Sequence, residues 1–149
     1  MAAPSGYSRQ QIRLHWAVVA LVALQYILHD GVASAFDRGM AEGALTFSAP
    51  VIGHFVSGSL ILFLVMWRLM LRSQRGVPDL PAQDSALQRR LAHGTHLAFY
   101  ALLLLLPVTG AAAWAMAAEA ASTARAVLRA LLLLAIVLHV GGAVIGQWV

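Results

Sequence analysis

The chain has 149 residues, of which 60% are hydrophobic and only 11% are charged, and its mean hydropathy is +0.77. A composition this apolar excludes an ordinary soluble domain and indicates one integral membrane domain over residues 1–149. Its ten basic residues, all arginine, exceed the six acids to give a net charge of +4, an excess typical of cytoplasmic loops and not of nucleic-acid binding. Cysteine is absent, which excludes disulfides, Fe–S clusters, thiolate zinc sites and covalently attached haem.

Four apolar stretches are long enough to cross a bilayer, because a hydrocarbon core of about 30 Å needs about 20 residues of helix. The predicted fold is therefore an all-α, integral membrane, up-and-down bundle of four transmembrane helices. The expected spans cover residues 12–29, 50–71, 91–118 and 127–149.

The distribution of arginine predicts how the bundle is oriented. Arg9 and Arg13 precede the first span, and five more arginines lie around the connection between the second and third spans. The connection after the first span carries Asp30, Asp37 and Glu42 instead. Because arginine is enriched on the cytoplasmic side of membrane proteins, we expect both termini and the middle loop to be cytoplasmic.

The first span has a second interpretation as a signal peptide, because basic residues, a short apolar run and small residues at 33–35 imitate a cleavage site. Three polar side chains argue against cleavage, since Gln25, His15 and His29 would be unusual in a discarded segment. We therefore expect this segment to remain as the first helix.

Two histidines of the first span, His15 and His29, are 14 residues apart. At about 1.5 Å rise and 3.6 residues per turn, both rings return to nearly one helix face about 21 Å apart. Ionisable side chains are costly in a bilayer and usually functional there. The alternative is that each ring makes one interhelical hydrogen bond. The spacing favours two cofactors stacked across the membrane.

The predicted depths of four histidines form two layers. His15 and His139 share the cytoplasmic half of the membrane, whereas His29 and His54 share the outer half. Pairs of imidazoles in two layers are what two non-covalent b-type haems require. We therefore predict these four residues as iron ligands.

A third group lies on the cytoplasmic side, where His93 and His96 are separated by one helical turn. These residues can ligate the inner haem in place of His15, line a quinone pocket or carry protons. Arg13 and Arg68 lie on the same side and are candidate partners for haem propionates or an anionic substrate. Their alternative role is to set the topology and to contact lipid headgroups.

Short motifs in order along nearly the whole chain resemble the bacterial cytochrome b561 family, the four-helix di-haem cytochromes that include superoxide oxidase. They are Tyr7-Ser8-Arg9 with His15-Trp16, His54 with Gly58 and Trp67-Arg68-Leu69, Ala92-His93 to His96 with Tyr100, Pro107 and Gly110, and finally His139. The resemblance implies a bundle in the bacterial cytoplasmic membrane that holds two haem b groups and passes electrons between a donor and ubiquinone.

The resemblance also implies ligand positions, and one of them departs from the family. Spans one and four hold the inner haem, here through His15 and His139, and spans two and four hold the outer haem. His54 fits the second span, but the position 14 residues before His139 is Arg125, and arginine does not bind haem iron. Either the outer haem is absent, leaving one haem, or His29 supplies its second ligand. We favour His29, with Arg125 then paired to an outer propionate.

The predicted function is transmembrane electron transfer by a b-type cytochrome that exchanges electrons with quinone, with superoxide:ubiquinone oxidoreductase activity as one form of it. Whether the chain is itself an enzyme is left open. One alternative is a cytochrome subunit that serves a protein redox partner within a larger membrane or periplasmic dehydrogenase complex. Others are a redox-inert anchor or assembly subunit and a membrane di-iron enzyme, for which the sequence offers few carboxylate ligands.

Overall fold

The computed structural model describes residues 6–78, 85–116 and 119–148, and every regular element in these ranges is an α helix. Each of the four is long and apolar enough to cross a membrane, which confirms the predicted four-helix membrane fold. The helices are α1 (Arg9–Glu42), α2 (Ala49–Arg75), α3 (Ala86–Met116) and α4 (Glu119–Trp148).

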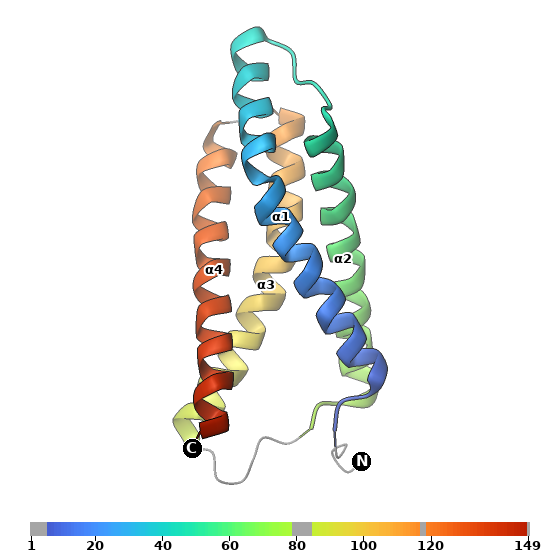
Figure 1. The fold of residues 1–149 in the computed structure, drawn as a ribbon, viewed down its shortest axis with the longest axis vertical. Coiled ribbons are helices and arrows are strands. Elements are labelled where there is room, and N and C mark those ends of the chain that lie inside the picture. The colour runs from blue at the N-terminus through green and yellow to red at the C-terminus, as the bar shows by residue number, and fades with distance from the viewer. Residues whose placement is uncertain (1–5, 79–84, 117–118, 149) are drawn as a thin grey trace.

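The helices run alternately up and down (Figure 1). The start of α1 and the end of α4 lie at one end of the bundle, here called the terminal end, together with the connection from α2 to α3. The connections from α1 to α2 and from α3 to α4 lie at the opposite, distal end. The orientation of these two ends in the membrane stays a prediction.

The first helix begins with a capping box. The Gln11 backbone N–H donates to the Ser8 hydroxyl at 3.3 Å, and the Ser8 backbone N–H donates to Oε1 of Gln11 at 2.9 Å. These two bonds satisfy backbone donors that an unfinished first turn leaves free. Gly43 ends the helix in the left-handed region, with φ 71°, which glycine adopts without a steric penalty.

The predicted end of the first span at His29 is wrong, because α1 continues to Glu42. Val32, Ala35, Phe36 and Gly39 are buried and recur at helical spacing, so this segment forms an amphipathic helix and not a loop. The polar residue Asp30 ended the predicted span, but it lies on the exposed face of the same helix. The expected cleavage-like residues 33–35 therefore lie inside an unbroken helix.

The other bounds differ less. The second helix extends the predicted 50–71 by a turn at its carboxyl end, and the third begins a turn before the predicted 91. The fourth begins at Glu119, eight residues before the predicted 127, because the alanine-rich segment there continues the helix. Positions 117–118 and 149 of the predicted spans lie outside the described residues.

The helices pack mainly as two hairpins. Helix α1 lies along α2 and α3 lies along α4, and α2 joins the hairpins by packing on α3. One apolar core lies toward the terminal half, around Leu14, Ile61 and Val65. A smaller core lies at the distal end, around Val51 and Trp114. Because the hairpins meet mainly along α2 and α3, space remains between α1 and α4.

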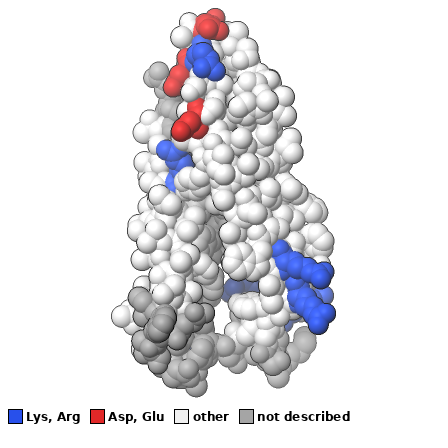
Figure 2. Space-filling view, in the orientation of Figure 1, with Lys and Arg blue, Asp and Glu red and all other residues white. Residues whose placement is uncertain are grey.

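The outer surface suits a lipid environment. Large apolar side chains such as Trp16, Ile27 and Phe63 are exposed, and the middle of the molecule is almost free of charged groups in Figure 2. Acidic groups gather toward the distal end of that view, and several arginines gather toward the terminal end. A surface of this kind is stable when hydrocarbon chains cover it.

Candidate functional sites

Three imidazoles from three helices meet near the terminal end of the bundle. The ring of His139 on α4 lies 6.2 Å from the ring of His15 on α1 and 5.6 Å from the ring of His96 on α3, centroid to centroid. Phe99 completes the contact, with its ring 5.3 Å from that of His139. We call His15, His96, Phe99 and His139 the terminal cluster.

The distance between His15 and His139 fits coordination of one metal ion. Metal–imidazole bonds are about 2 Å long, so two imidazoles on opposite sides of one ion have centroids roughly 6 Å apart. Figure 2 shows the surface hollowed between α4 and α1 toward the terminal end. Gly142, one turn beyond His139, has no atom within 4 Å of where a Cβ would stand. This pair therefore has the separation and the space that a planar cofactor needs.

The structure separates His93 from His96. His96 contacts His139 in the terminal cluster, whereas His93 is exposed and lines an open groove with Arg89 and Arg90. His96 is thus placed to act beside the His15–His139 pair. The groove is more typical of a solvated or headgroup-facing surface.

The predicted arginines of the terminal end have different surroundings. Nη1 of Arg68 donates to the Gln11 carbonyl at 3.1 Å, which ties α2 to the start of α1. The guanidinium of Arg72 lies over the ring of Tyr100 at 5.9 Å, a cation–π geometry. Arg13 is exposed on α1.

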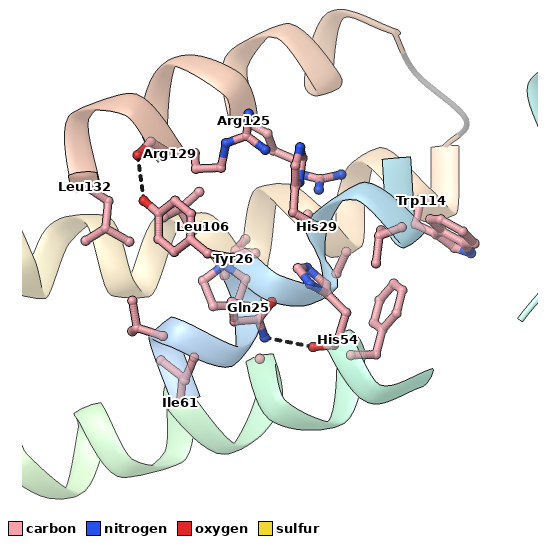
Figure 3. Close-up of a pocket in the computed structure, with 18 of the residues that line it drawn as sticks. Gln25, Tyr26, His29, His54, Ile61, Leu106, Trp114, Arg125, Arg129 and Leu132 are labelled. Carbon is pink, nitrogen blue, oxygen red and sulfur yellow. Dashed lines mark hydrogen bonds between the residues drawn. The ribbon is translucent and has the colours of Figure 1, made fainter. Parts of the chain in front are cut away.

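A cavity of about 570 Å³ lies in the distal half of the bundle, and all four helices contribute to its wall. His29 from α1, His54 from α2 and Arg125 from α4 line it together (Figure 3). Its volume is within the usual range for a cofactor or small-molecule site. The structure thus brings the predicted outer-layer residues to one cavity, which we call the distal cavity.

His54 is held in place through its own helix. Nε2 of Gln25 on α1 donates to the His54 carbonyl at 2.9 Å and to the hydroxyl of buried Ser57 at 3.0 Å (Figure 3). Gly58 allows this approach, because a Cβ there would stand 3.1 Å from Nε2 of Gln25. Nδ1 of His54 is buried without a hydrogen-bond partner. An unpaired buried nitrogen of this kind is expected where a ligand normally completes a site.

The fourth helix adds two arginines to the distal cavity. Arg125 and Arg129 are one turn apart, and both line the cavity. The hydroxyl of Tyr26 on α1 donates to the Arg129 carbonyl at 3.0 Å, which links the two hairpins across the space between them. Sequence reasoning did not single out Tyr26, although its position three residues before His29 places it on the same face of the helix.

An aromatic group closes the distal cavity. Trp114 on α3 is 7% exposed, and its ring lies 5.8–5.9 Å from three phenylalanine rings. These rings belong to Phe36, Phe47 and Phe55. Sequence reasoning also missed this group. Its only sequence signal is that Trp114 follows Gly110 by four residues and so shares its helix face.

In the ranges that the structure describes, no three or more His, Asp or Glu side chains are arranged to hold a metal ion by themselves. Each histidine pair supplies two donors at most. Two donors are what axial coordination of a haem requires, since the porphyrin supplies the other four. Both pairs therefore fit a haem as far as their donor chemistry is concerned.

A four-helix membrane bundle with histidine pairs in two layers defines a class of protein, the membrane cytochromes with non-covalent haem. The model of one family, described as prokaryotic cytochrome b561, matches residues 6–149. The chain belongs to the prokaryotic cytochrome b561 family. Family membership implies haem b and electron transport by a multi-pass protein of a bacterial inner membrane.

Three curated relatives are similar to this chain. It is 34% identical over 119 residues to cytochrome b562 of Cereibacter sphaeroides, which covers 76% of this chain and 70% of the relative. It is 32% identical over 106 residues to the probable superoxide oxidase CybB of Yersinia pestis, covering 71% and 56% of the two chains. It is 26% identical to cytochrome b561 homolog 1 of Escherichia coli, covering 71% and 57%. The chain thus spans little more than half of the last two relatives.

Proposed function

We propose that this chain carries electrons across the membrane between two haem b sites, one at each end of the bundle, with a quinone as one redox partner. The observation that carries the proposal is the 6.2 Å separation of the His15 and His139 rings, which come from α1 and α4 and lie in the hollow between the hairpins. When bound, haem b supplies reversible one-electron chemistry at its iron.

At the terminal end, His15 and His139 would hold the iron through their imidazole nitrogens. Leu14 and Val18 on α1 and Leu132 and Ala135 on α4 are buried near the same space. Such apolar surroundings limit access of water and, together with nearby charges, set the reduction potential. The protein therefore contributes position, a low dielectric constant and charge, and no covalent chemistry.

At the distal end, we propose that His29 and His54 hold the second iron. Both line the distal cavity, and the carbonyl of His54 is tied to α1 by Gln25, four residues before His29. The interval of 14 residues from His15 to His29 places the two sites about 21 Å apart along α1. Helix α1, in place of α4, would then carry one ligand for each haem.

We place quinone exchange at the terminal end, which we propose to be cytoplasmic from its arginines. Quinone reduction takes up two protons with its two electrons, so its site needs proton donors. The ring of His96 lies 5.6 Å from that of His139 and is not needed as an axial ligand. An imidazole there can supply a proton close to the electron-carrying site.

Superoxide is the electron donor to test first, because one relative is named a probable superoxide oxidase. An anionic donor would be attracted by Arg125 and Arg129 of the distal half, whereas exposed Asp30 and Asp37 would oppose it. Reduction of the purified protein by a superoxide source, with and without added quinone, tests this donor directly.

The central experiment is haem analysis of the purified full chain after haem-replete expression. We expect a Soret band, a sharp α band after dithionite and two haems per chain by pyridine haemochrome analysis. His29→Ala should retain one haem, whereas the exposed control His93→Ala should retain two. Absence of both bands would refute the cytochrome, one haem in the wild type would refute the distal site, and two haems in His29→Ala would refute His29 as a ligand.

A further inference from the structure

Two guanidinium groups share the distal cavity with the proposed iron ligands. Arg125 and Arg129 are one turn apart on α4 and neither is fully exposed. Among the described residues that line the cavity, the only acidic one is Asp37, an exposed residue two turns beyond His29. The cavity wall therefore carries an excess of positive charge.

A charged side chain inside a membrane protein is costly unless an opposite charge or polar groups satisfy it. Tyr26 satisfies the backbone carbonyl of Arg129 and not its guanidinium. Helix α3 contributes no titratable side chain to the cavity wall, and at Gly110 a Cβ would stand 3.8 Å from Nε of Arg125. The bare backbone of Gly110 thus leaves Arg125 room along α3 without neutralising it.

The positions of these groups give the cavity two chemically different sides. In Figure 3, Arg125 lies on the α4 side and His54 on the α2 side, with His29 between them in the view. The α2 side offers an unpaired imidazole nitrogen, which suits a metal ion. The α4 side offers two guanidinium groups, which suit two carboxylates.

We propose that Arg125 and Arg129 bind the two propionate carboxylates of the distal haem and so fix its orientation, with the propionates toward α4. This inference rests on the proposed distal haem. It gives Arg125 a function of its own at the position where the resemblance places a histidine ligand. Arginine pairs with carboxylates through two parallel hydrogen bonds, which gives orientation as well as binding.

The test compares Arg125→Gln, Arg129→Gln and Arg125→Lys with the matched control Arg38→Gln, an exposed arginine on the distal part of α1. Each purified protein is analysed for haem content, for the midpoint potential of each haem and for the propionate bending bands in resonance Raman spectra. A nearby positive charge favours the reduced haem, so its loss lowers the potential. We expect each Gln variant to shift the reduction equilibrium of the distal haem about tenfold, or about 59 mV.

Selective effects would support the proposal. The propionate bands should shift in both Gln variants, Arg125→Lys should recover part of the potential, and the terminal haem and the Arg38→Gln control should be unchanged. Loss of only the distal haem from the Gln variants, with Arg125→Lys retaining it, supports the proposal equally. Two haems with unchanged distal potential and Raman bands in both Gln variants would overturn it alone, whereas a wild type with one haem would overturn the distal haem as well.

Discussion

The terminal cluster and the distal cavity use the same two helices in opposite ways. At the terminal end, α1 and α4 each contribute an imidazole, and the rings of His15 and His139 lie 6.2 Å apart. At the distal end, 14 residues away on each helix, α1 again offers a histidine but α4 offers Arg125. The comparison teaches that the two ends of one bundle can change ligands independently, because the helical repeat alone connects them.

The two ends also differ in how firmly the protein holds its residues. Polar contacts surround the distal cavity, from Gln25 to His54 and Ser57 and from Tyr26 to Arg129. The contacts of the terminal cluster are between aromatic rings. A distal site with fixed walls and a terminal site that can adjust its third imidazole are suited to different tasks, storage of an electron and exchange with a diffusible partner.

Removal of His139 should have the largest effect. His139→Ala deletes the ring that contacts both His15 and His96, so we expect loss of the terminal haem and a fall to one haem per chain. Pyridine haemochrome analysis measures this, with Phe99→Leu as a control that removes a neighbouring ring but no ligand. Retention of two haems in His139→Ala would show that His15 and His96 can hold the iron together.

Restoring a histidine on α4 should recover what the loss of His29 removes. We expect the double variant His29→Ala with Arg125→His to bind two haems again, because position 125 lies one family interval before His139. Haem content and the low-spin reduced spectrum measure the recovery. If the double variant retains only one haem, the equivalence of the α1 and α4 positions is wrong.

A methyl group at Gly31 should disturb the distal end alone. A Cβ there would stand 2.8 Å from Cβ of Pro50 on α2, so Gly31→Ala forces α1 and α2 apart next to His29. Overpacking of this kind costs about 1–3 kcal/mol. Thermal unfolding in detergent and the spectrum of the distal haem measure the effect.

The matched control for that variant is Gly94→Ala, since no atom lies within 4 Å of a Cβ at Gly94. There the substitution should be neutral or stabilise the helix by about 0.5–1 kcal/mol. Equal destabilisation by both variants would mean that the close approach of α1 and α2 has no special role at the distal end.

The smallest effect is expected from Gln25→Leu, which removes two hydrogen bonds between α1 and α2. Interhelical hydrogen bonds in membranes contribute about 0.6 kcal/mol each, so we expect a loss near 1 kcal/mol and partial high-spin character at the distal haem. Ser34→Ala is the control, because its hydrogen bond stays within α1. An unchanged distal spectrum would show that Gln25 does not position His54.

The fold was largely predictable because long apolar runs admit few structures in a bilayer, and the number of helices was correct. The extension of α1 was not predicted, because Asp30 interrupts the apolar run although Val32, Ala35, Phe36 and Gly39 continue the helical repeat. Hydropathy reports the hydrocarbon core, whereas a helix that packs on protein can continue beyond it.

For the sites, spacing predicted which histidines share a level, and the structure brings His15 together with His139 and His29 together with His54. The same spacing could not separate His96 from His93, because neighbours one turn apart diverge only when a third helix packs against them. Tyr26 and Trp114 were missed because ordinary aromatic side chains give no signal until the cavity that they line is known.

The length of α1 has a consequence for how a donor can reach the distal cavity. Between His29 and Glu42 the helix continues for 13 residues, or about 20 Å. A soluble protein that docks on the tip of the bundle therefore stands far above the histidine pair along the bundle axis. A small molecule or a lipid-borne carrier that approaches from the flank meets the cavity wall at its own level, so the flank offers the shorter route.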